Sequence, residues 1–263
     1  MNCNIHKDKN MTADEKSSVR LCSMALVVFA LTGVFLVEQV IQPSYWIKTA
    51  IKVAAFSVPV ILYSFWSDKG ILESINLRKI SRPAPLILCM LLFFTGVMLL
   101  FFIFHNQLDL AGIKQSLMQK ENLTKSNCLF VFSYIVLCNS FLEEAFFRGF
   151  VSRLFSSENT GSLLSTFTKF MTLKKIDIKV SADMAGFLLS AVLFSLYHIG
   201  IFITWFNVGM FILCVAGLAG VGLFLQWIAE KFHSIAASYV VHASANISIN
   251  LIGALLIFEI IGN

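Results

Sequence analysis

Long apolar runs separated by short polar segments dominate this sequence. A membrane-spanning helix needs about 20 mostly apolar residues, and seven stretches qualify: 21–41, 47–66, 84–104, 128–151, 184–204, 206–227 and 234–258. No polar turn interrupts 185–227, and we place the break between the fifth and sixth runs at Asn207-Val208-Gly209. The pattern predicts an all-α, polytopic transmembrane helix bundle of about seven spanning helices, or eight if two runs have been joined.

The composition agrees with a chain that mostly faces lipid. Of the 263 residues, 57% are hydrophobic and 13% are charged, with a mean hydropathy of +0.80. The six cysteines have neither disulfide-framework nor C-x-x-C spacing, so we interpret them as small core residues. The first apolar run is too long for a cleaved signal peptide, and we expect it to remain as an anchor. We therefore expect a cytoplasmic segment over 1–20 and a single transmembrane domain over 21–263.

Lysines and arginines are divided unevenly between the two sides of the predicted bundle. With the N-terminus inside, fourteen face the cytoplasm: Lys7, Lys9, Lys16, Arg20, Lys69, Arg78, Lys79, Arg82, Arg153, Lys169, Lys174, Lys175, Lys179 and Lys231. Five face the other side: Lys48, Lys52, Lys114, Lys120 and Lys125. This asymmetry favours a cytoplasmic N-terminus. The multi-pass protein would lie in the inner membrane of a bacterium or the endoplasmic reticulum of a eukaryote. We expect it to contact the lipid bilayer and to bind no nucleic acid.

Three of the segments that connect the predicted spans have a distinctive composition. Residues 67–83 and 106–126 mix apolar and charged residues at helical spacing, which predicts short helices at the membrane interface. The stretch 152–183 is the longest polar connection and is rich in Ser, Thr, Asn and Gly. We expect 152–183 to lie in the cytoplasm.

A few ionisable residues fall inside the predicted spans, where each costs about 2.5–3.5 kcal/mol on insertion scales. They are Glu38, Glu143, Glu144, Arg148, His198 and His242, accompanied by the neutral polar residues Asn246 and Asn250. Such residues require a partner or a function. They are therefore the candidate functional residues of the chain.

The pair Glu143-Glu144 is followed four residues later by Arg148. The spacing of Glu144 and Arg148 places an acid and a base on one helix face, whereas Glu143 points about 100° away and has no cation on its own helix. The segment therefore supplies either one ion pair and one unpaired carboxylate, or simply charges at a membrane-water boundary.

The histidines fall on two later spans. His198 stands near the end of an apolar run, where a hydrogen-bonded packing role is the alternative to chemistry. His242, Asn246 and Asn250 are each four residues apart and form a polar stripe on one helix face. We interpret Asn250 as a residue that links helices by hydrogen bonds; for His242 and Asn246, both that role and a chemical one stay open.

Together these spans offer a carboxylate, two imidazoles and an amide, which suffice for peptide hydrolysis by an activated water. The carboxylate can accept the proton of the water, and N–H groups one helical turn apart can stabilise an oxyanion. Two His and a Glu could instead bind zinc, but H-E-x-x-H is absent and the ligands would come from three helices. On the predicted boundaries, Glu143 and His198 would differ by roughly 10 Å in depth at about 1.5 Å rise per residue.

Three short motifs in these spans resemble the motifs of a known protein family. Glu143-Glu144-x-x-x-Arg148, Phe194-x-x-x-His198 and His242-x-x-x-Asn246 are similar, in order, to those of the CAAX protease and bacteriocin-processing family (CPBP, or Abi), which includes the type II CAAX prenyl endopeptidases. The resemblance covers about 128–250. It implies an all-α membrane bundle, usually of about eight spans, with a cavity that opens toward the cytosol.

The resemblance also implies a set of roles. Glu143 with His198 would activate the water, His242 and Asn246 would form the oxyanion hole, and Glu144 with Arg148 would support the site. No metal and no cofactor is implied. The expected substrate is a membrane-associated peptide or protein, either of the lipidated CAAX type or a bacteriocin or sorting-signal precursor. The main alternative is a non-enzymatic immunity or regulatory scaffold of the same fold; a transporter agrees less well, because the buried polar groups cluster at one place.

Overall fold

The structure, a computed structural model, describes residues 12–66, 80, 83–156, 182–202 and 206–261. Within these ranges the chain is helical and contains no strand. The helices are α1 (Ala13–Leu36), α2 (Tyr45–Trp66), α4 (Pro83–Phe104), α5 (Leu110–Gln119), α6 (Cys128–Tyr134), α7 (Ser140–Glu144), α8 (Ser152–Ser156), α10 (Ala182–Phe202), α11 (Val208–Lys231) and α12 (Ile235–Ile257). The π-helical segments Val37–Ile41, Ile135–Asn139 and Ala145–Val151 continue α1, α6 and α7, and a short 3₁₀ turn, His105–Gln107, follows α4.

The predicted all-α transmembrane bundle is confirmed. Six helical runs in the described residues are long and apolar enough to cross a membrane: Ser17–Ile41, Tyr45–Trp66, Pro83–Gln107, Cys128–Phe155, Val208–Lys231 and Ile235–Ile257. The remaining predicted span, 184–204, corresponds to α10, whose apolar part Met184–Ile199 is shorter. The chain is thus an integral, multi-pass membrane protein.

The boundary between α10 and α11 falls where the sequence predicted a break. Asn207 is the N-cap of α11, and its side-chain oxygen accepts a hydrogen bond from Met210 N at 3.0 Å. This cap satisfies one of the backbone N–H groups that a helix start leaves without an intrahelical partner. The helix then runs to Lys231, four residues past the predicted end at 227.

The connecting segments are described only in part. Within 106–126, α5 confirms a short helix, capped by Asp109, whose Oδ1 accepts from Gly112 N at 2.9 Å. The predicted interfacial helix over 67–83 lies almost wholly outside the described residues. So do most of the 152–183 connection and the first eleven residues.

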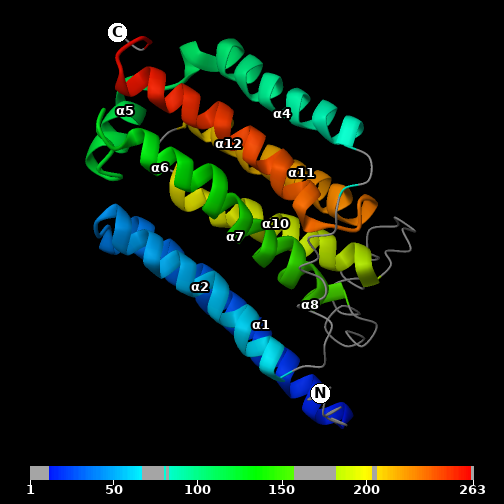
Figure 1. The fold of residues 1–263 in the computed structure, drawn as a ribbon. Helices are drawn as coiled ribbons and strands as arrows, with labels where there is room; N and C mark the ends of the chain where they lie inside the picture. Colours follow the sequence, from blue (N-terminus) through cyan, green and yellow to red (C-terminus); the bar gives the residue numbers. More distant parts are fainter. Residues whose placement is uncertain (1–11, 67–79, 81–82, 157–181, 203–205, 262–263) are drawn as a thin grey trace, which may run out of the picture.

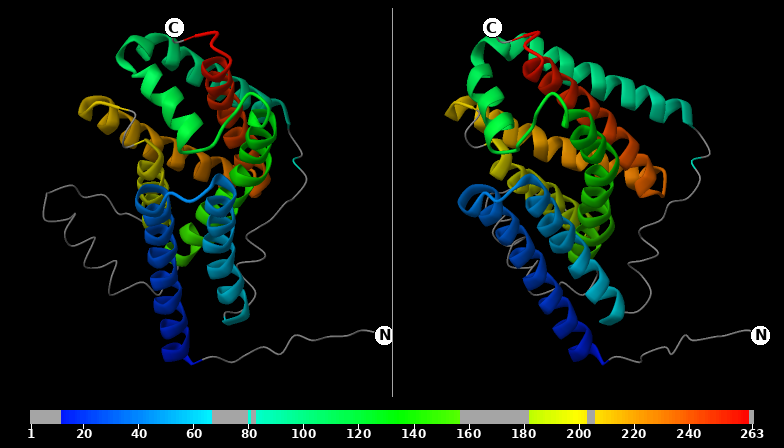
Figure 2. Two further views of the ribbon diagram at one scale, coloured as in Figure 1. Left: turned by 90° about the vertical axis from the view of Figure 1, so that its left-hand side faces the viewer. Right: turned by 60° about the vertical axis from the view of Figure 1, so that its left-hand side comes forward.

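The helices pack as a bundle with α12 near its centre (Figure 1). The antiparallel pair α1 and α2 packs on one side, against α10 and α7, while α4 and α11 pack against α12 on the other side. Figure 2 shows the same arrangement from two further directions. Half of the apolar window of α12 is buried, against 6% for α4. The helix that carries His242 is therefore among the most enclosed of the spans.

A cluster of aromatic rings fills the space between α2, α10 and the π-helical segment Ala145–Val151. Phe56 stacks on Phe146 with ring centroids 4.4 Å apart, and Phe147 packs edge-on against both Phe56 and Phe194. All four rings are almost completely buried. This rigid packing holds the helix that carries Glu143 and Glu144 against α10.

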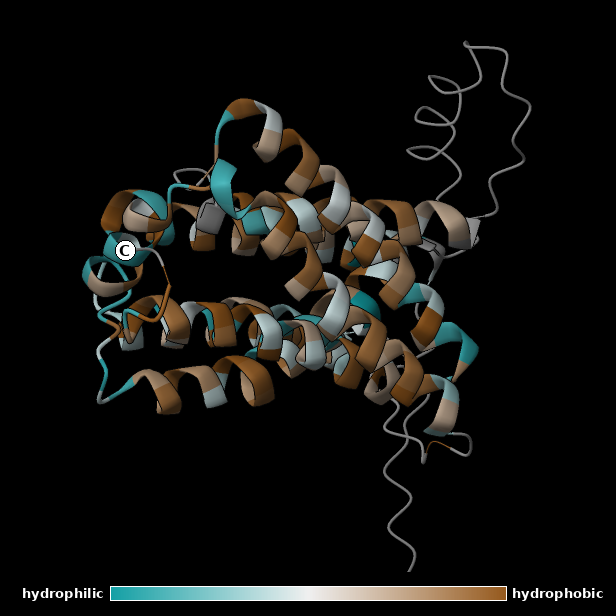
Figure 3. Cartoon of the chain, turned by 90° about the horizontal axis from the view of Figure 1, so that it is seen from above, coloured by the Kyte–Doolittle hydropathy of each residue, from teal (hydrophilic) through white to brown (hydrophobic). Residues whose placement is uncertain are grey.

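Most of the outer surface is apolar, as lipid contact requires. Figure 3 shows hydrophobic residues along the helices and hydrophilic ones gathered mainly near their ends. Large exposed side chains on α4 include Leu88, Leu92, Leu99 and Phe102. In water such a surface would be an aggregation hazard; against hydrocarbon it is the expected exterior.

Candidate active site

The helix that carries the acidic motif changes its winding around it. The short α7 lies between the π-helical segments Ile135–Asn139 and Ala145–Val151. Ser140 Oγ donates to Ile135 O, five residues back, at 3.0 Å, and Ser152 Oγ donates to Arg148 O at 2.6 Å. π-helical turns occur frequently at functional sites. Here they accompany a segment whose charged side chains are all buried.

The two carboxylate oxygens of the buried Glu143 have different surroundings. Oε1 accepts hydrogen bonds from Asn139 Nδ2 at 2.7 Å and Tyr197 OH at 3.0 Å. Oε2 makes no hydrogen bond within the described part of the chain; it lies 3.7 Å from Nε2 of His198 and 3.6 Å from Nε2 of His242. These separations exceed hydrogen-bonding distance. One oxygen is therefore held in place, and the other faces two imidazole nitrogens.

The orientation of His198 follows from its other ring nitrogen. Nδ1 lies 2.8 Å from the backbone oxygen of Phe194, one turn earlier on α10. Because a carbonyl oxygen can only accept, Nδ1 carries the hydrogen, and Nε2 of the neutral ring is an acceptor. The lone pair of Nε2 thus faces the same space as Glu143 Oε2.

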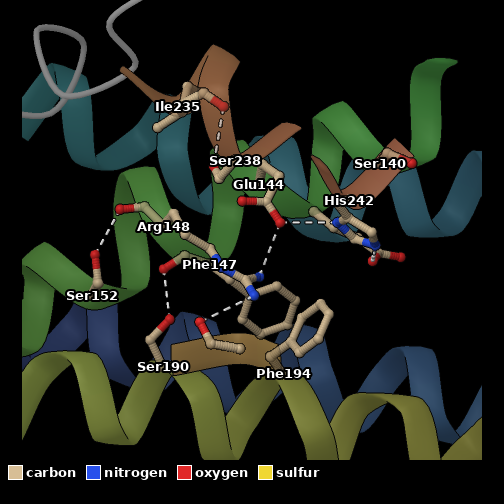
Figure 4. Close-up of polar contacts among 12 residues, drawn as sticks. Ser140, Glu144, Phe147, Arg148, Ser152, Ser190, Phe194, Ile235, Ser238 and His242 are labelled. Carbon is tan, nitrogen blue, oxygen red and sulfur yellow. Dashed lines mark hydrogen bonds and ion pairs between the residues drawn. The ribbon is translucent and has the colours of Figure 1, made fainter. Parts of the chain in front are cut away.

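Glu144 joins the acidic motif to α12 (Figure 4). Its Oε1 lies 2.9 Å from His242 Nδ1 and 3.3 Å from Arg148 Nη1. The guanidinium of Arg148 also stacks 4.1 Å from the ring centroid of Phe194 and donates to Gly222 O at 3.5 Å. The ion pair predicted from the four-residue spacing is present, and the structure adds the histidine to it.

Gly222 permits this close packing. A Cβ at Gly222 would lie only 3.0 Å from the backbone Cα of Ala191, so any side chain there would push α10 and α11 apart. The glycine therefore lets α11 approach closely enough for its backbone oxygen to reach Arg148 in the buried site.

The two asparagines of the α12 stripe have separate partners. Asn246 Nδ2 donates to Ser140 Oγ at 2.8 Å, and its side chain is partly exposed. Asn250 Nδ2 donates to Phe132 O at 3.2 Å and links α12 to α6, the helix-linking role that the sequence analysis favoured. Asn246 thus lies one turn from His242, beside the helix of Glu143, with its amide bonded to a serine of that helix.

Sequence analysis did not identify two of the residues that contact Glu143, namely Asn139 and Tyr197. Asn139 precedes Glu143 by four residues, a spacing that could have identified it as a partner on the same helix face. Tyr197 stands next to His198 in the chain, but only the tertiary packing of α10 on α7 shows that its hydroxyl reaches Glu143.

The predicted difference in depth between Glu143 and His198 was wrong. Their side chains lie 3.7 Å apart, and the helical run from Cys128 extends to Phe155 rather than to 151. This extension moves Glu143 away from the end of its span, toward the level of His198.

A metal site was the alternative that the sequence left open. Among the residues that the structure describes, no three His, Cys, Asp or Glu side chains are grouped as metal ligands would be. The chelation experiment in the Discussion tests zinc at Glu143, His198 and His242 directly.

The polytopic helix bundle thus buries two carboxylates and two imidazoles from three helices, and groups of these kinds can exchange protons with a water molecule. Residues 125–248, slightly under half of the chain, match the family model described as type II CAAX prenyl endopeptidase Rce1-like, and this match supports the CAAX protease family. Neither a curated protein nor a solved structure matches the chain. The match supports a CAAX-type membrane endopeptidase, a class whose substrates are membrane-associated peptides or proteins in a lipid environment.

Proposed function

We propose that this protein hydrolyses a peptide bond near the membrane surface in a lipidated, CAAX-type protein, using a water activated by Glu143. Bacteriocin-type or sorting-signal precursors are the corresponding substrates in a cell without prenylated proteins. The observation that carries the proposal is the Glu143 carboxylate, with one oxygen anchored by two hydrogen bonds and the other directed at two imidazoles. The catalytic part of the single transmembrane domain would lie within about 128–250.

The distances support a shared water. Polar atoms separated by more than 3.5 Å are commonly bridged by a water molecule, and Glu143 Oε2 stands at 3.7 and 3.6 Å from His198 Nε2 and His242 Nε2. A water here could donate one hydrogen to the Glu143 carboxylate and the other to the acceptor Nε2 of His198. Both interactions would turn the oxygen lone pair of the water toward a substrate carbonyl.

The charges of the site support His242 as the oxyanion donor. Two carboxylates, Glu143 and Glu144, share this enclosed space with one guanidinium, that of Arg148. A proton on His242 would balance the two negative charges with two positive ones, as buried charges require. Nδ1–H would then donate to Glu144, and Nε2–H would face the reacting groups. Asn246 would supply a second donor by turning its amide away from Ser140.

The proposed reaction has two steps. The water oxygen attacks the carbonyl carbon of the substrate while its proton passes to Glu143, and the developing oxyanion accepts hydrogen bonds from His242 and Asn246. The C–N bond then breaks as Glu143 returns the proton to the leaving nitrogen. The products are a new carboxylic acid, which releases its remaining proton to solvent to become a carboxylate, and a new amine, and Glu143 is again ionised.

A direct cleavage assay tests the proposal. The purified protein in detergent is incubated with a peptide that carries a farnesylated cysteine followed by two aliphatic residues and a C-terminal Met, and the products are identified by mass spectrometry. We expect cleavage within the last four residues. No cleavage of this peptide, of its unprenylated form or of membrane-anchored precursor peptides would favour the non-enzymatic scaffold.

A further inference from the structure

A second charged cluster lies on α1 and α2, outside the segment that matches the protease family. Lys48 is its buried centre: Nζ lies 2.8 Å from Glu121 Oε1 and 3.3 Å from Glu38 Oε2, and it donates to Lys120 O at 3.3 Å. Two carboxylates and a carbonyl therefore surround this ammonium group. Lys48 joins α2 to the turn after α5 and to the end of α1.

Lys52, one turn further along α2, is placed differently. Its Nζ is 3.9 Å from Glu38 Oε1, beyond hydrogen-bonding distance, and it makes no hydrogen bond within the described part of the chain. The side chain is 15% exposed, and the carboxylate nearest to it is shared with Lys48. A lysine has three N–H donors and is costly at membrane depth. Lys52 thus has N–H groups available to donate hydrogen bonds to a further anionic partner.

The position of Lys52 relates it to the reacting groups. Its Nζ lies 5.5 Å from the ring centroid of Tyr197, and the hydroxyl of that ring donates to Glu143 Oε1 at 3.0 Å. One tyrosine side chain therefore separates the ammonium group from the carboxylate of Glu143. With the N-terminus inside, as the charge distribution predicts, Lys52 lies beyond Glu143 for a chain that enters from the cytoplasm.

This separation has the dimension of a short peptide tail. A CAAX sequence ends its chain, so every peptide bond within it lies at most three residues from a free α-carboxylate. Three extended residues span roughly 10 Å. A carbonyl beside Glu143 could therefore place its terminal carboxylate on the far side of the Tyr197 ring.

We propose that Lys52 binds the C-terminal α-carboxylate of the substrate and so limits cleavage to the end of a chain. Glu38 holds the lysine toward the site, and the buried Lys48, which also pairs with the partly exposed Glu121, keeps Glu38 in place. Binding would replace the distant Glu38 contact with a charge-assisted hydrogen bond to the carboxylate. The inference rests on the proposed function, because it assigns a specificity residue to the same reaction.

The test compares two farnesylated CAAX peptides that differ only at the C-terminus, one with a free carboxylate and one with a primary amide. Values of kcat/KM are measured for the wild type, Lys52→Gln, Lys52→Arg and the surface control Lys125→Gln, whose side chain is 60% exposed. The wild type should prefer the free carboxylate by at least about tenfold, the effect of one hydrogen bond between charged groups. Lys52→Gln should reduce this ratio to near one, mostly through a higher KM for the carboxylate peptide, while Lys52→Arg and Lys125→Gln keep it.

Two results would overturn the assignment. In the first, the wild type cleaves both peptides equally well. In the second, Lys52→Gln slows both peptides by the same factor, which would mean that Lys52 acts through Tyr197 and Glu143 rather than on the substrate. Cleavage of neither peptide by the wild type would instead remove the proposed function itself, and the role of Lys52 with it.

Discussion

Glu144 Oε1 lies 2.9 Å from Nδ1 of His242, although the two residues are 98 positions apart in the chain. The same oxygen pairs with Arg148 at 3.3 Å. A single carboxylate thereby holds both the guanidinium and the imidazole, and it turns Nε2 of His242 toward Glu143. The two adjacent glutamates thus have different surroundings: Glu144 is bonded to Arg148 and His242, and Glu143 faces the space between the histidines.

Glu144→Gln is expected to destabilise the protein. The substitution leaves the buried guanidinium of Arg148 without its carboxylate, a loss of about 3–5 kcal/mol for a buried pair. Thermal unfolding in detergent measures the effect. The control is Glu259→Gln, which removes an exposed carboxylate paired with Lys114 and should leave the melting temperature nearly unchanged. Equal melting temperatures for the two variants would mean that Glu144 and Arg148 do not stabilise the fold.

Asn246→Ala should reduce turnover by about 10²–10³-fold, the usual effect of losing one oxyanion donor. Asn250→Ala is the matched control, because Asn250 lies on the same helix one turn further and donates to Phe132 O. We expect the control to lower stability with little effect on kcat. Steady-state kinetics on folded protein separate the two, and full activity of Asn246→Ala would remove this residue from the oxyanion hole.

The orientation in the membrane can be tested by cysteine accessibility. Single cysteines introduced in 1–20, 67–83 and 152–183 should react with a membrane-impermeant reagent only from the cytoplasmic side, because these segments hold most of the lysines and arginines. Cysteines introduced near Lys114 or Lys125 should react from the opposite side. Labelling of 152–183 from outside would contradict both the topology and a site that opens toward the cytoplasm.

Activity should survive exhaustive chelation. The proposed reaction requires only a carboxylate, two imidazoles and an amide, all supplied by the chain. The measurement is cleavage of the farnesylated peptide before and after dialysis against a zinc chelator, with metal content determined in parallel. Activity that disappears on chelation and returns with one equivalent of zinc would assign Glu143, His198 and His242 as metal ligands instead.

The parts of the structure that depend on local pattern could be predicted from the sequence. Apolar runs of sufficient length identified the spanning helices, and the break placed at Asn207-Val208-Gly209 coincides with the start of α11. The four-residue spacing of Glu144 and Arg148 predicted their ion pair, found at 3.3 Å. Each of these features is determined within a few turns of one helix, where spacing translates directly into geometry.

The features that depend on how helices pack could not be predicted. The level of His198 relative to Glu143 is set by where α10 begins and how far the preceding helical run extends. The hydroxyl of Tyr197 and the amide of Asn139 distinguish the two oxygens of Glu143. The contact of Tyr197 with Glu143 joins two helices and has no signature in the sequence. Asn139 could have been found from its spacing.

The most direct test of the account is the turnover of Glu143→Gln. Glutamine keeps the size of the side chain and an oxygen that can accept from Asn139 and Tyr197, but it cannot take a proton from water. The variant should melt close to the wild-type temperature and still bind the farnesylated CAAX peptide. Its kcat should fall by about 10²–10⁴-fold, the contribution of a general base. A folded Glu143→Gln protein with near-normal kcat would contradict the assignment of Glu143 as the general base.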